Sequence, residues 1–299
     1  MDDMTQILVA PTNDGNELAR ENQGNLLIDR PTARELAQKA LAIIQAGAYY
    51  TNNQSVSIAD AVARCVAGTV SLPPDAALPK PPFASPALTL TLSVANETSL
   101  SAAKRFVDAG KRPLVLNYAN AVEPGGGFLS GSTAQEEYLC RSSALYATIK
   151  NDPMYAYHRA MKAESYLATE WAILSPSVPV FRRDSGSLAP EPWEVDVLTC
   201  AAPVARAVGL ERATPAMESR IDRVLEIARA YGYRSLVLGA WGCGAFHNDP
   251  VAIAGFFRHA LTGRFLGAFD DAHFAITDWS PERRYLAPFR DTFASVAVE

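Results

Sequence analysis

The chain has 299 residues, with 27 Lys and Arg against 32 Asp and Glu, which gives a formal net charge of −5. Apolar residues make up 48% and charged residues 20%, as in ordinary globular proteins, so collagen-like, disulfide-scaffold and broadly disordered chains are excluded. The length allows one large domain or a core with an appendage. The acidic balance argues against direct DNA binding by bulk charge, because that mode depends on many contacts of Lys and Arg with phosphates.

The cysteines and histidines show no metal-binding or redox spacing. The four cysteines are far apart and form no CxxC pair, so we expect free, buried thiols. The N-terminus lacks an apolar run of signal-peptide length, and no apolar stretch approaches the roughly 20 residues of a membrane span. We therefore expect a cytoplasmic protein without a metal, a cofactor or a membrane contact, and a monomer is the default.

The first part of the chain is expected to be a tail followed by a helical extension. Residues 1–29 are polar and Asn-rich, which is typical of a flexible tail. Residues 30–86 are expected to form a helical N-terminal extension, whose first helix can be capped by Thr32 with Glu35. The proline-rich run 72–86 predicts an extended connector.

Residues 87–299 are expected to form the core of the protein, because strands alternate with helices along this stretch. That order indicates a three-layer α/β/α sandwich with a mixed, largely parallel central sheet. One long helix is predicted to start at Thr214-Pro215 and another at Asp249-Pro250. In such sheets, ligands bind where loops leave the carboxyl ends of strands. Two strand-to-helix loops of this chain are unusually rich in glycine.

The first Gly-rich loop follows a predicted strand at 113–118. The loop and the helix start after it combine three glycines with an amide and two carboxylates: Gly125, Gly126, Gly127, Gln135, Glu136 and Glu137. Consecutive glycines let a ligand approach the backbone closely. The helix dipole tends to keep such carboxylates ionised, so a general acid here needs desolvation or a nearby anion to raise its pKa. The three glycines also allow a plain flexible turn. Separately, Thr133 with Glu136 matches a capping box, in which Glu136 would only close the start of the helix.

The second Gly-rich loop joins a strand at 236–239 to the helix that Asp249-Pro250 begins. Its backbone N–H groups, placed before a helix N-terminus, can cradle a phosphate without Lys or Arg. A tight turn packed by Trp241 is the plain alternative, and Cys243 with His247 can also be read as a nucleophilic pair, although no third orienting group is evident. The candidate binding residues of this loop are Gly239, Gly242, Cys243, Gly244, Ala245 and Phe246.

Taken together, the two loops give the chain a resemblance to poly(ADP-ribose) glycohydrolases. Gly-Gly-Gly, seven residues and Gln-Glu-Glu match that family's signature, and NYANAVEPGGGFLSGSTAQEEYLCRSSALY looks like its bacterial-type branch. Trp-Gly-Cys-Gly-Ala-Phe is similar to the family's diphosphate loop. His247 stands where a small residue, often Gly, is expected, and Val204 where a polar one, often Asn, is expected. The resemblance covers most of the chain and implies a macrodomain fold that binds ADP-ribose.

The resemblance also implies a reaction and a role for each motif residue. The substrate would be poly(ADP-ribose), cleaved at the ribose–ribose O-glycosidic bond to release ADP-ribose. Glu137 would protonate the leaving oxygen and then deprotonate water. Glu136 would orient the distal ribose and Asn120 would hold it, while the Gln of the motif would help fix the site. The glycines of the first loop and residues 239–246 would bind the diphosphate through amides, with Phe246 supporting the adenosine.

Two other functions stay open on the sequence alone. The first is an ADP-ribose-binding macrodomain that does not cleave its ligand. The complete Gln-Glu-Glu triplet argues against it, because a reader needs no second carboxylate. The second is a hydrolase of mono-ADP-ribosylated protein or of another ADP-ribose derivative. In the favoured reading, poly(ADP-ribosyl)ated proteins are the partners, and an acidic chain recognises one or two units of a polyanion by oriented amides.

Overall fold

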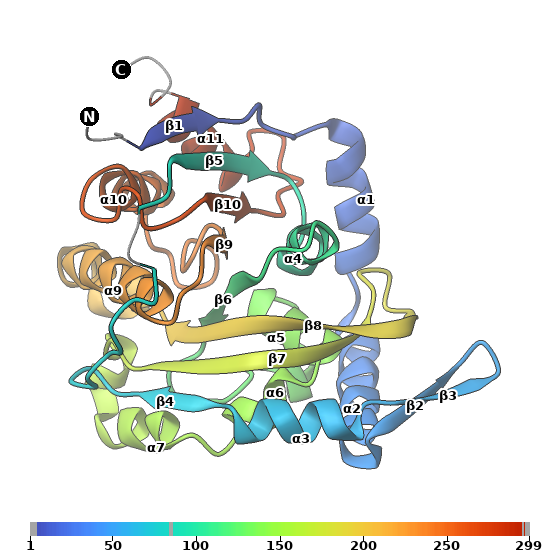
Figure 1. Ribbon diagram of the computed structural model, residues 1–299. Helices are drawn as coiled ribbons and strands as arrows, with labels where there is room; N and C mark the ends of the chain where they lie inside the picture. Colours follow the sequence, from blue (N-terminus) through green and yellow to red (C-terminus); the bar gives the residue numbers. More distant parts are fainter. Residues whose placement is uncertain (1–4, 84–85, 295, 297–299) are drawn as a thin grey trace.

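A mixed β-sheet with helices on both faces organises the chain in the computed structural model, which describes residues 5–83, 86–294 and 296 (Figure 1). The strands of this sheet are, in spatial order, β1 (Gln6–Val9), β5 (Thr89–Ala95), β10 (Asp271–Ala275), β9 (Ser235–Leu238), β6 (Pro113–Ala119), β8 (Leu188–Ala201), β7 (Ala172–Arg182) and β4 (Val70–Leu72). Neighbours from β1 to β8 pair in parallel, whereas β8 with β7 and β7 with β4 pair antiparallel.

The helices divide between the two faces of the sheet, which confirms the predicted three-layer sandwich. One face is covered by α9 (Leu210–Ala230), α10 (Pro250–Thr262) and α11 (Leu286–Ala294). The other is covered by α2 (Arg30–Ala46), α4 (Ser99–Asp108), α5 (Gln135–Ser142), α6 (Leu145–Ile149) and α7 (Pro153–Ala160). The remaining elements are α1 (Asn16–Leu26), α3 (Ala59–Ala67), α8 (Ala205–Val208), the 3₁₀ turns η1 (Phe128–Ser130) and η2 (Lys162–Tyr166), and the hairpin strands β2 (Ala48–Thr51) and β3 (Gln54–Ser57).

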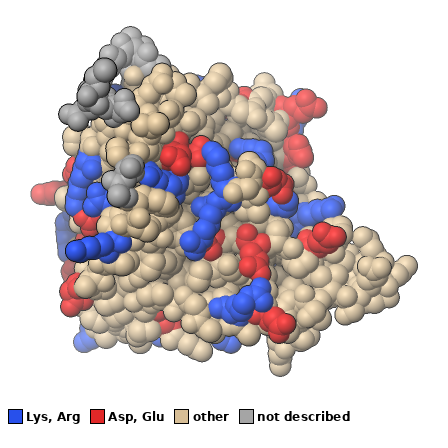
Figure 2. Space-filling view, viewed as in Figure 1, with Lys and Arg blue, Asp and Glu red and all other residues tan. Residues whose placement is uncertain are grey.

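The β2–β3 hairpin projects from one side of the molecule (Figure 1). Asn52 and Asn53 turn it with φ of 48° and 59°, the left-handed conformations that a two-residue hairpin turn needs. On the face shown in Figure 2, Lys and Arg are interspersed with Asp and Glu, and the projecting part is mostly uncharged. This face therefore presents no continuous basic track.

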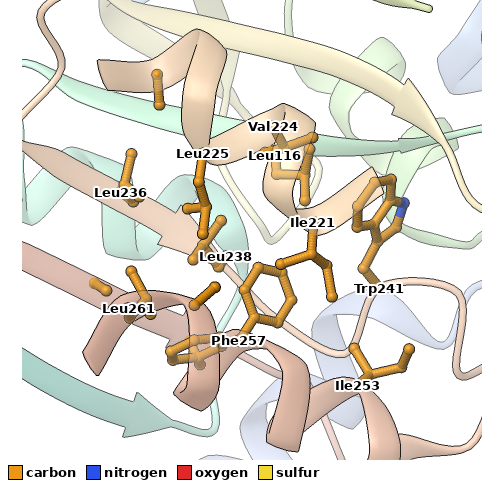
Figure 3. Close-up of a cluster of buried hydrophobic side chains, with 14 of the residues drawn as sticks. Leu116, Ile221, Val224, Leu225, Leu236, Leu238, Trp241, Ile253, Phe257 and Leu261 are labelled. Carbon is orange, nitrogen blue, oxygen red and sulfur yellow. The ribbon is translucent and has the colours of Figure 1, made fainter. Parts of the chain in front are cut away.

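Strand side chains alternate between the two faces of the sheet and supply two hydrophobic cores. Leu236 and Leu238 of β9 pack with the residues of α9 and α10, beside Trp241 (Figure 3). Val237, between them, belongs to the core on the opposite face. All four residues of β9 are buried, as expected for a parallel strand that is covered on both faces.

The structure differs from the flexible tail that we expected over residues 1–29. Of residues 1–29, the first four lie outside the described part. The others include β1, which pairs with β5 as an edge strand, and α1, which follows it. Asn22 of α1 is buried, and its Nδ2 donates to the backbone oxygen and Oδ1 of Asn96 at 2.8 and 3.0 Å. Because this buried contact is polar, hydropathy does not reveal it. At the opposite edge, β4 also comes from residues before 87, so the expected boundary at 86/87 cuts across one sheet.

Three predicted helix boundaries also differ. Asp29, rather than Thr32, caps α2, and its Oδ1 accepts a hydrogen bond from the Thr32 N–H at 2.7 Å. The pattern of residues 133–150 predicts one helix after the first Gly-rich loop, but the structure has two, α5 and α6, because Ser143 is extended and bridges to β7. The long helix begins at Leu210, so Pro215 lies inside α9, where a proline removes one backbone hydrogen bond.

The cysteines are free and buried, as expected: Cys65, Cys140, Cys200 and Cys243. Within residues 5–83, 86–294 and 296, no helix is long and apolar enough to cross a membrane. The same residues contain no group of three or more His, Cys, Asp or Glu side chains placed to hold a metal ion.

Candidate active site

Both Gly-rich loops leave the sheet at the same edge. β6 and β9 are adjacent and parallel, with Pro113 opposite Ser235 and Val115 opposite Val237, so their carboxyl ends lie side by side. The two strand ends also touch, because a Cβ on Gly239 would lie 2.2 Å from the Tyr118 hydroxyl oxygen. This is the edge at which open α/β sheets bind their ligands.

The first loop wraps around two carboxyl groups at the start of α5. Gly125 and Gly126 have left-handed φ values of 73° and 58°, which side chains other than glycine rarely adopt. A Cβ on Gly126 would lie 2.6 Å from Glu137 Oε1 and 3.0 Å from Glu136 Oε2. The bare backbone of Gly126 therefore lies against both carboxyl groups, and a larger residue would displace them.

Glu137 keeps one carboxyl oxygen without a protein partner. The side chain is 8% exposed, and its Oε1 accepts a hydrogen bond from the Gly127 N–H at 2.9 Å. Its Oε2 is buried and makes no hydrogen bond within the described part of the chain. Since an unpartnered buried carboxyl oxygen is costly in a folded protein, this atom marks a group that is suited to exchange a proton with a bound molecule.

Glu136 is held inside the site by two donors. Its Oε2 accepts from the Asn120 N–H at 2.7 Å, and its Oε1 accepts from Asn117 Nδ2 at 3.4 Å. Burial raises the pKa of Glu136 to about 8; the hydrogen bond from Asn120 opposes this rise, and the neighbouring Glu137 adds to it. Burial therefore shifts Glu136 toward its protonated form, the direction opposite to the one in which a helix N-terminus acts.

The alternative that Thr133 and Glu136 form a capping box is not supported by the structure. The N-cap of α5 is Ala134, and no side chain caps the helix. Glu136 points its carboxyl group at the loop backbone rather than at its own helix start, and it is 3% exposed. Two glutamates at a helix start are ordinarily exposed to solvent, but here both side chains are buried.

We expect the raised pKa of Glu136 to make the protein less stable as the pH rises from about 5 to about 8. The pKa of this carboxyl is about 8 in the folded chain against an ordinary 4.5. The stabilisation is thus complete below pH 4.5 and is lost as the pH passes through 8. Each pKa unit corresponds to about 1.4 kcal/mol, so the loss is on the order of a few kcal/mol.

Urea unfolding across this pH range measures the effect. Glu136→Gln removes the titrating group, so its stability relative to the wild-type protein should improve steadily between pH 5 and pH 8. Wild-type and variant curves that run parallel over the whole range would contradict the assignment.

Asn117 on β6 is a site residue that the sequence motifs do not single out. It is fully buried, and its Nδ2 donates to Thr199 Oγ1 of β8 at 3.1 Å as well as to Glu136. The available signal is an amide side chain within an otherwise apolar strand, and such a group needs a buried partner. Asn117 thereby links Glu136 to the neighbouring strand.

Gln135 makes its hydrogen bonds within the protein. Its Oε1 accepts from the Tyr118 N–H at 2.9 Å, and its Nε2 donates to the Leu116 carbonyl oxygen at 2.8 Å and to Ser99 Oγ at 3.1 Å. The start of α5 is therefore tied to the end of β6, which places the two glutamates beside the loop.

Asn120 shapes the first loop with its side chain. Its Oδ1 accepts hydrogen bonds from the N–H groups of Val122 and Glu123, both at 2.9 Å, while its own N–H holds Glu136. His158 lies behind this loop, bonded through Nδ1 to the Ala121 carbonyl oxygen at 3.0 Å and through Nε2 to Thr169 Oγ1 at 2.8 Å. His158 thus has a structural role behind the loop.

The second loop borders a cavity of about 320 Å³. Gly242, Gly244, Ala245 and Phe246 line it, and so do Gln135 and Tyr138 of α5. The cavity therefore reaches the helix that carries the glutamates. The remaining candidate site residues do not line this cavity: Asn120, Gly125, Gly126, Gly127, Glu136, Glu137, Gly239 and Cys243.

The alternative nucleophilic pair of Cys243 and His247 finds no support. Cys243 is buried in the core, its Sγ donates to the Trp241 carbonyl oxygen at 3.7 Å, and burial raises the pKa of its thiol. His247 is exposed. His247 also has φ of 62°, a conformation that glycine adopts without strain, which accounts for the small residue expected at this position.

Val204 donates its N–H to the Tyr166 carbonyl oxygen at 2.7 Å.

The fold and the site define a macrodomain-like α/β/α protein with a carboxyl pair beside a bare glycine loop. The family described as microbial-type PARG, catalytic domain, matches residues 37–183, and this span includes the first Gly-rich loop and both glutamates. The chain belongs to this family, the microbial-type poly(ADP-ribose) glycohydrolases.

Solved structures of bacterial poly(ADP-ribose) glycohydrolases resemble the chain over most of its length. The Thermomonospora curvata enzyme is 40% identical with a TM-score of 0.82, and the match covers 88% of this chain and 100% of that chain. Its complex with the inhibitor ADP-HPD is 39% identical with a TM-score of 0.80, covering 88% and 99%. The Deinococcus radiodurans enzyme in complex with ADP-ribose is 36% identical with a TM-score of 0.70, covering 79% and 98%. A comparison with curated proteins found no match.

Proposed function

We propose that the chain acts as a poly(ADP-ribose) glycohydrolase in which Glu137 is the general acid and base. Family membership and the similarity to an enzyme solved with ADP-HPD support the activity. The observation that carries the role of Glu137 is its buried Oε2, which has no hydrogen-bond partner in the described residues and lies on a carboxyl group held against the bare Gly126 backbone.

The reaction divides into two proton transfers by one carboxyl group. Glu137, protonated at the start, gives its proton to the departing 2′ oxygen of the adjacent unit as the bond from that oxygen to the distal ribose breaks. The carbon left behind has oxocarbenium character, and water attacks it while the Glu137 carboxylate removes a proton from that water. ADP-ribose leaves, and Glu137 is protonated again for the next turnover.

Glu136 binds and orients the distal ribose in this scheme. Since burial raises the pKa of Glu136 to about 8, its carboxyl is largely neutral at pH 7 and can both donate to and accept from ribose hydroxyls. Asn117 and the Asn120 backbone hold it in place. A neutral Glu136 also avoids repulsion with the carboxylate that Glu137 becomes once it has given its proton away.

The diphosphate and the adenosine are assigned to the cavity beside the second loop. The backbone N–H groups of Gly242, Gly244 and Ala245 supply donors without a cationic side chain, and Phe246 offers an apolar surface. The exposed position of Gly244, where an added Cβ would meet nothing within 4 Å, leaves its backbone open to close approach by a phosphate.

Gly244→Ala tests this assignment. The added methyl group meets no protein atom within 4 Å, so we expect the variant to fold with wild-type stability. In the cavity the methyl group keeps a diphosphate from the backbone, so Kd for ADP-ribose should rise by about tenfold or more, the equivalent of losing one hydrogen bond to a charged group. Calorimetric titration measures it, with Gly255→Ala as the control, since that Cβ also meets nothing within 4 Å. Wild-type affinity in Gly244→Ala would exclude this loop as the diphosphate site.

Release of ADP-ribose from purified poly(ADP-ribose) tests the activity itself. We expect turnover of the polymer by the wild-type chain, with much slower release from a mono-ADP-ribosylated protein. Binding of ADP-ribose without turnover of either substrate would favour a reader, and preference for the mono-ADP-ribosylated protein would favour the second alternative. The buried carboxyl of Glu137 argues against a reader, because a reader has no use for a group poised to transfer a proton.

We also propose that the protein acts in the cytoplasm, as a monomer, on poly(ADP-ribosyl)ated proteins and without direct DNA binding. Its free, buried cysteines suit a reducing compartment. Its net charge of −5 and the interspersed charges of the face in Figure 2 fit recognition of single units rather than a basic track. Size-exclusion chromatography with light scattering tests the monomeric state, and DNA titration at low salt tests the lack of direct DNA binding.

A further inference from the structure

Asn248 joins the second Gly-rich loop to the end of a neighbouring strand. It is 4% exposed. Its Nδ2 donates to the Pro203 carbonyl oxygen at 2.9 Å and to the Gly242 carbonyl oxygen at 3.1 Å. The backbone N–H of Asn248 donates to the same Gly242 oxygen, also at 3.1 Å. One side chain thus closes the loop on itself and ties it to the segment after β8.

The surrounding backbone is built around this contact. Gly242 has φ of 76°, and a Cβ there would lie 2.6 Å from Asn248 Nδ2 and 2.8 Å from Ala202 Cβ. His247 adopts its left-handed φ of 62° immediately before Asn248, and such a conformation in a residue other than glycine is held only when its surroundings enforce it. The backbone is therefore strained at His247, where the chain turns so that Asn248 faces Gly242.

Asn248 does not itself line the cavity, whereas Gly242, Gly244 and Ala245 do. We propose that Asn248 is a positioning residue for substrate binding, which sets the backbone N–H groups of Gly242, Gly244 and Ala245 at the places where the diphosphate is held. This inference rests on the proposed function. It assigns Asn248 to binding alone, because the proton transfers belong to Glu137 on the other loop.

Kinetics of Asn248→Ala on poly(ADP-ribose) test the inference. A displacement of about 1 Å in a positioning group can cost on the order of 100-fold, so we expect KM to rise about 10- to 100-fold. An interaction lost equally from the ground state and the transition state leaves kcat unchanged, so kcat should stay within about threefold of the wild-type value. Kd for ADP-ribose, measured by calorimetry, should rise with KM.

Asp249→Ala is the matched control. Asp249 follows Asn248 directly and caps α10 by accepting from the Val251 N–H at 3.0 Å. Within the described residues, its side chain makes no hydrogen bond to the second Gly-rich loop. Its loss should lower Tm and leave KM within about twofold. A merely structural role for Asn248 predicts the same behaviour for both variants.

A folded Asn248→Ala protein with wild-type KM overturns the inference, and so does a fall in kcat as large as the fall in kcat/KM. If Asn248→Ala does not melt cooperatively, Asn248→Ser, which removes the amide but keeps a small polar side chain, is judged by the same criterion. If the wild-type chain releases no ADP-ribose from polymer, the proposed activity fails; the ratio of ADP-ribose Kd values between Asn248→Ala and wild type then decides the inference by itself.

Discussion

Glu137→Gln is expected to lower kcat for release of ADP-ribose from poly(ADP-ribose) by about 10²- to 10⁴-fold, the usual contribution of general acid–base catalysis. The amide has the shape of the carboxyl group, and its oxygen can still accept from the Gly127 N–H, which now binds Oε1 at 2.9 Å. It can neither give a proton to the leaving oxygen nor take one from water. Kd for ADP-ribose should therefore stay within severalfold of the wild-type value.

Glu123→Gln is the control for this variant, because Glu123 is an exposed carboxylate on the same loop. It should keep wild-type kcat. Polymer turnover near the wild-type rate in Glu137→Gln would show that Glu137 is not the proton donor. Loss of ADP-ribose affinity in parallel with kcat would instead give this residue a binding role.

Gly126→Ala is expected to lower kcat/KM by about 100-fold or more. The new Cβ would lie 2.6 Å from Glu137 Oε1, closer than real Cβ contacts, so this carboxyl group must move. It would also lie 3.0 Å from Glu136 Oε2, a tight contact that requires a smaller shift. A displacement of about 1 Å at reacting groups can cost on the order of 100-fold. The left-handed φ of 58° adds backbone strain of about 1–2 kcal/mol to the folded state.

Gly110→Ala separates the two effects. Gly110 has φ of 74°, and a Cβ there would meet nothing within 4 Å, so this variant carries the backbone strain without the contact. It should lose stability to a similar degree and keep wild-type kcat/KM. Equal kinetic losses in the two variants, or none in Gly126→Ala, would contradict the close contact of Gly126 with the carboxyl groups.

The sandwich could be predicted from the chain because its central strands are short apolar runs separated by amphipathic helices with clear starts, such as Asp249-Pro250, whose Asp caps α10 as expected. The edge strand β1 and helix α1 could not. Their tie to the core runs through polar groups such as Asn22, which is buried against Asn96. A hydropathy pattern indicates which apolar side chains are buried, but it does not identify amide side chains that are buried with hydrogen-bond partners.

The two Gly-rich loops could be located from glycine content, but their meeting could not. It depends on β6 and β9 being neighbours although more than 100 residues separate them in the chain. For the same reason, the role of Asn117 could not be predicted. It depends on hydrogen bonds to Thr199 and Glu136, which lie beside Asn117 only in the folded sheet. Whether Glu136 caps a helix or faces the loop likewise depends on tertiary contacts, so the local capping pattern misleads.

A crystal structure of the wild-type protein with ADP-ribose tests the central claim most directly. The distal ribose should lie within hydrogen-bonding distance of Glu136 and Glu137. The diphosphate should lie on the backbone N–H groups of Gly242, Gly244 and Ala245, with the adenosine against Phe246. A complex in which the distal ribose points away from both glutamates would contradict the assignment of Glu137 as the general acid and base.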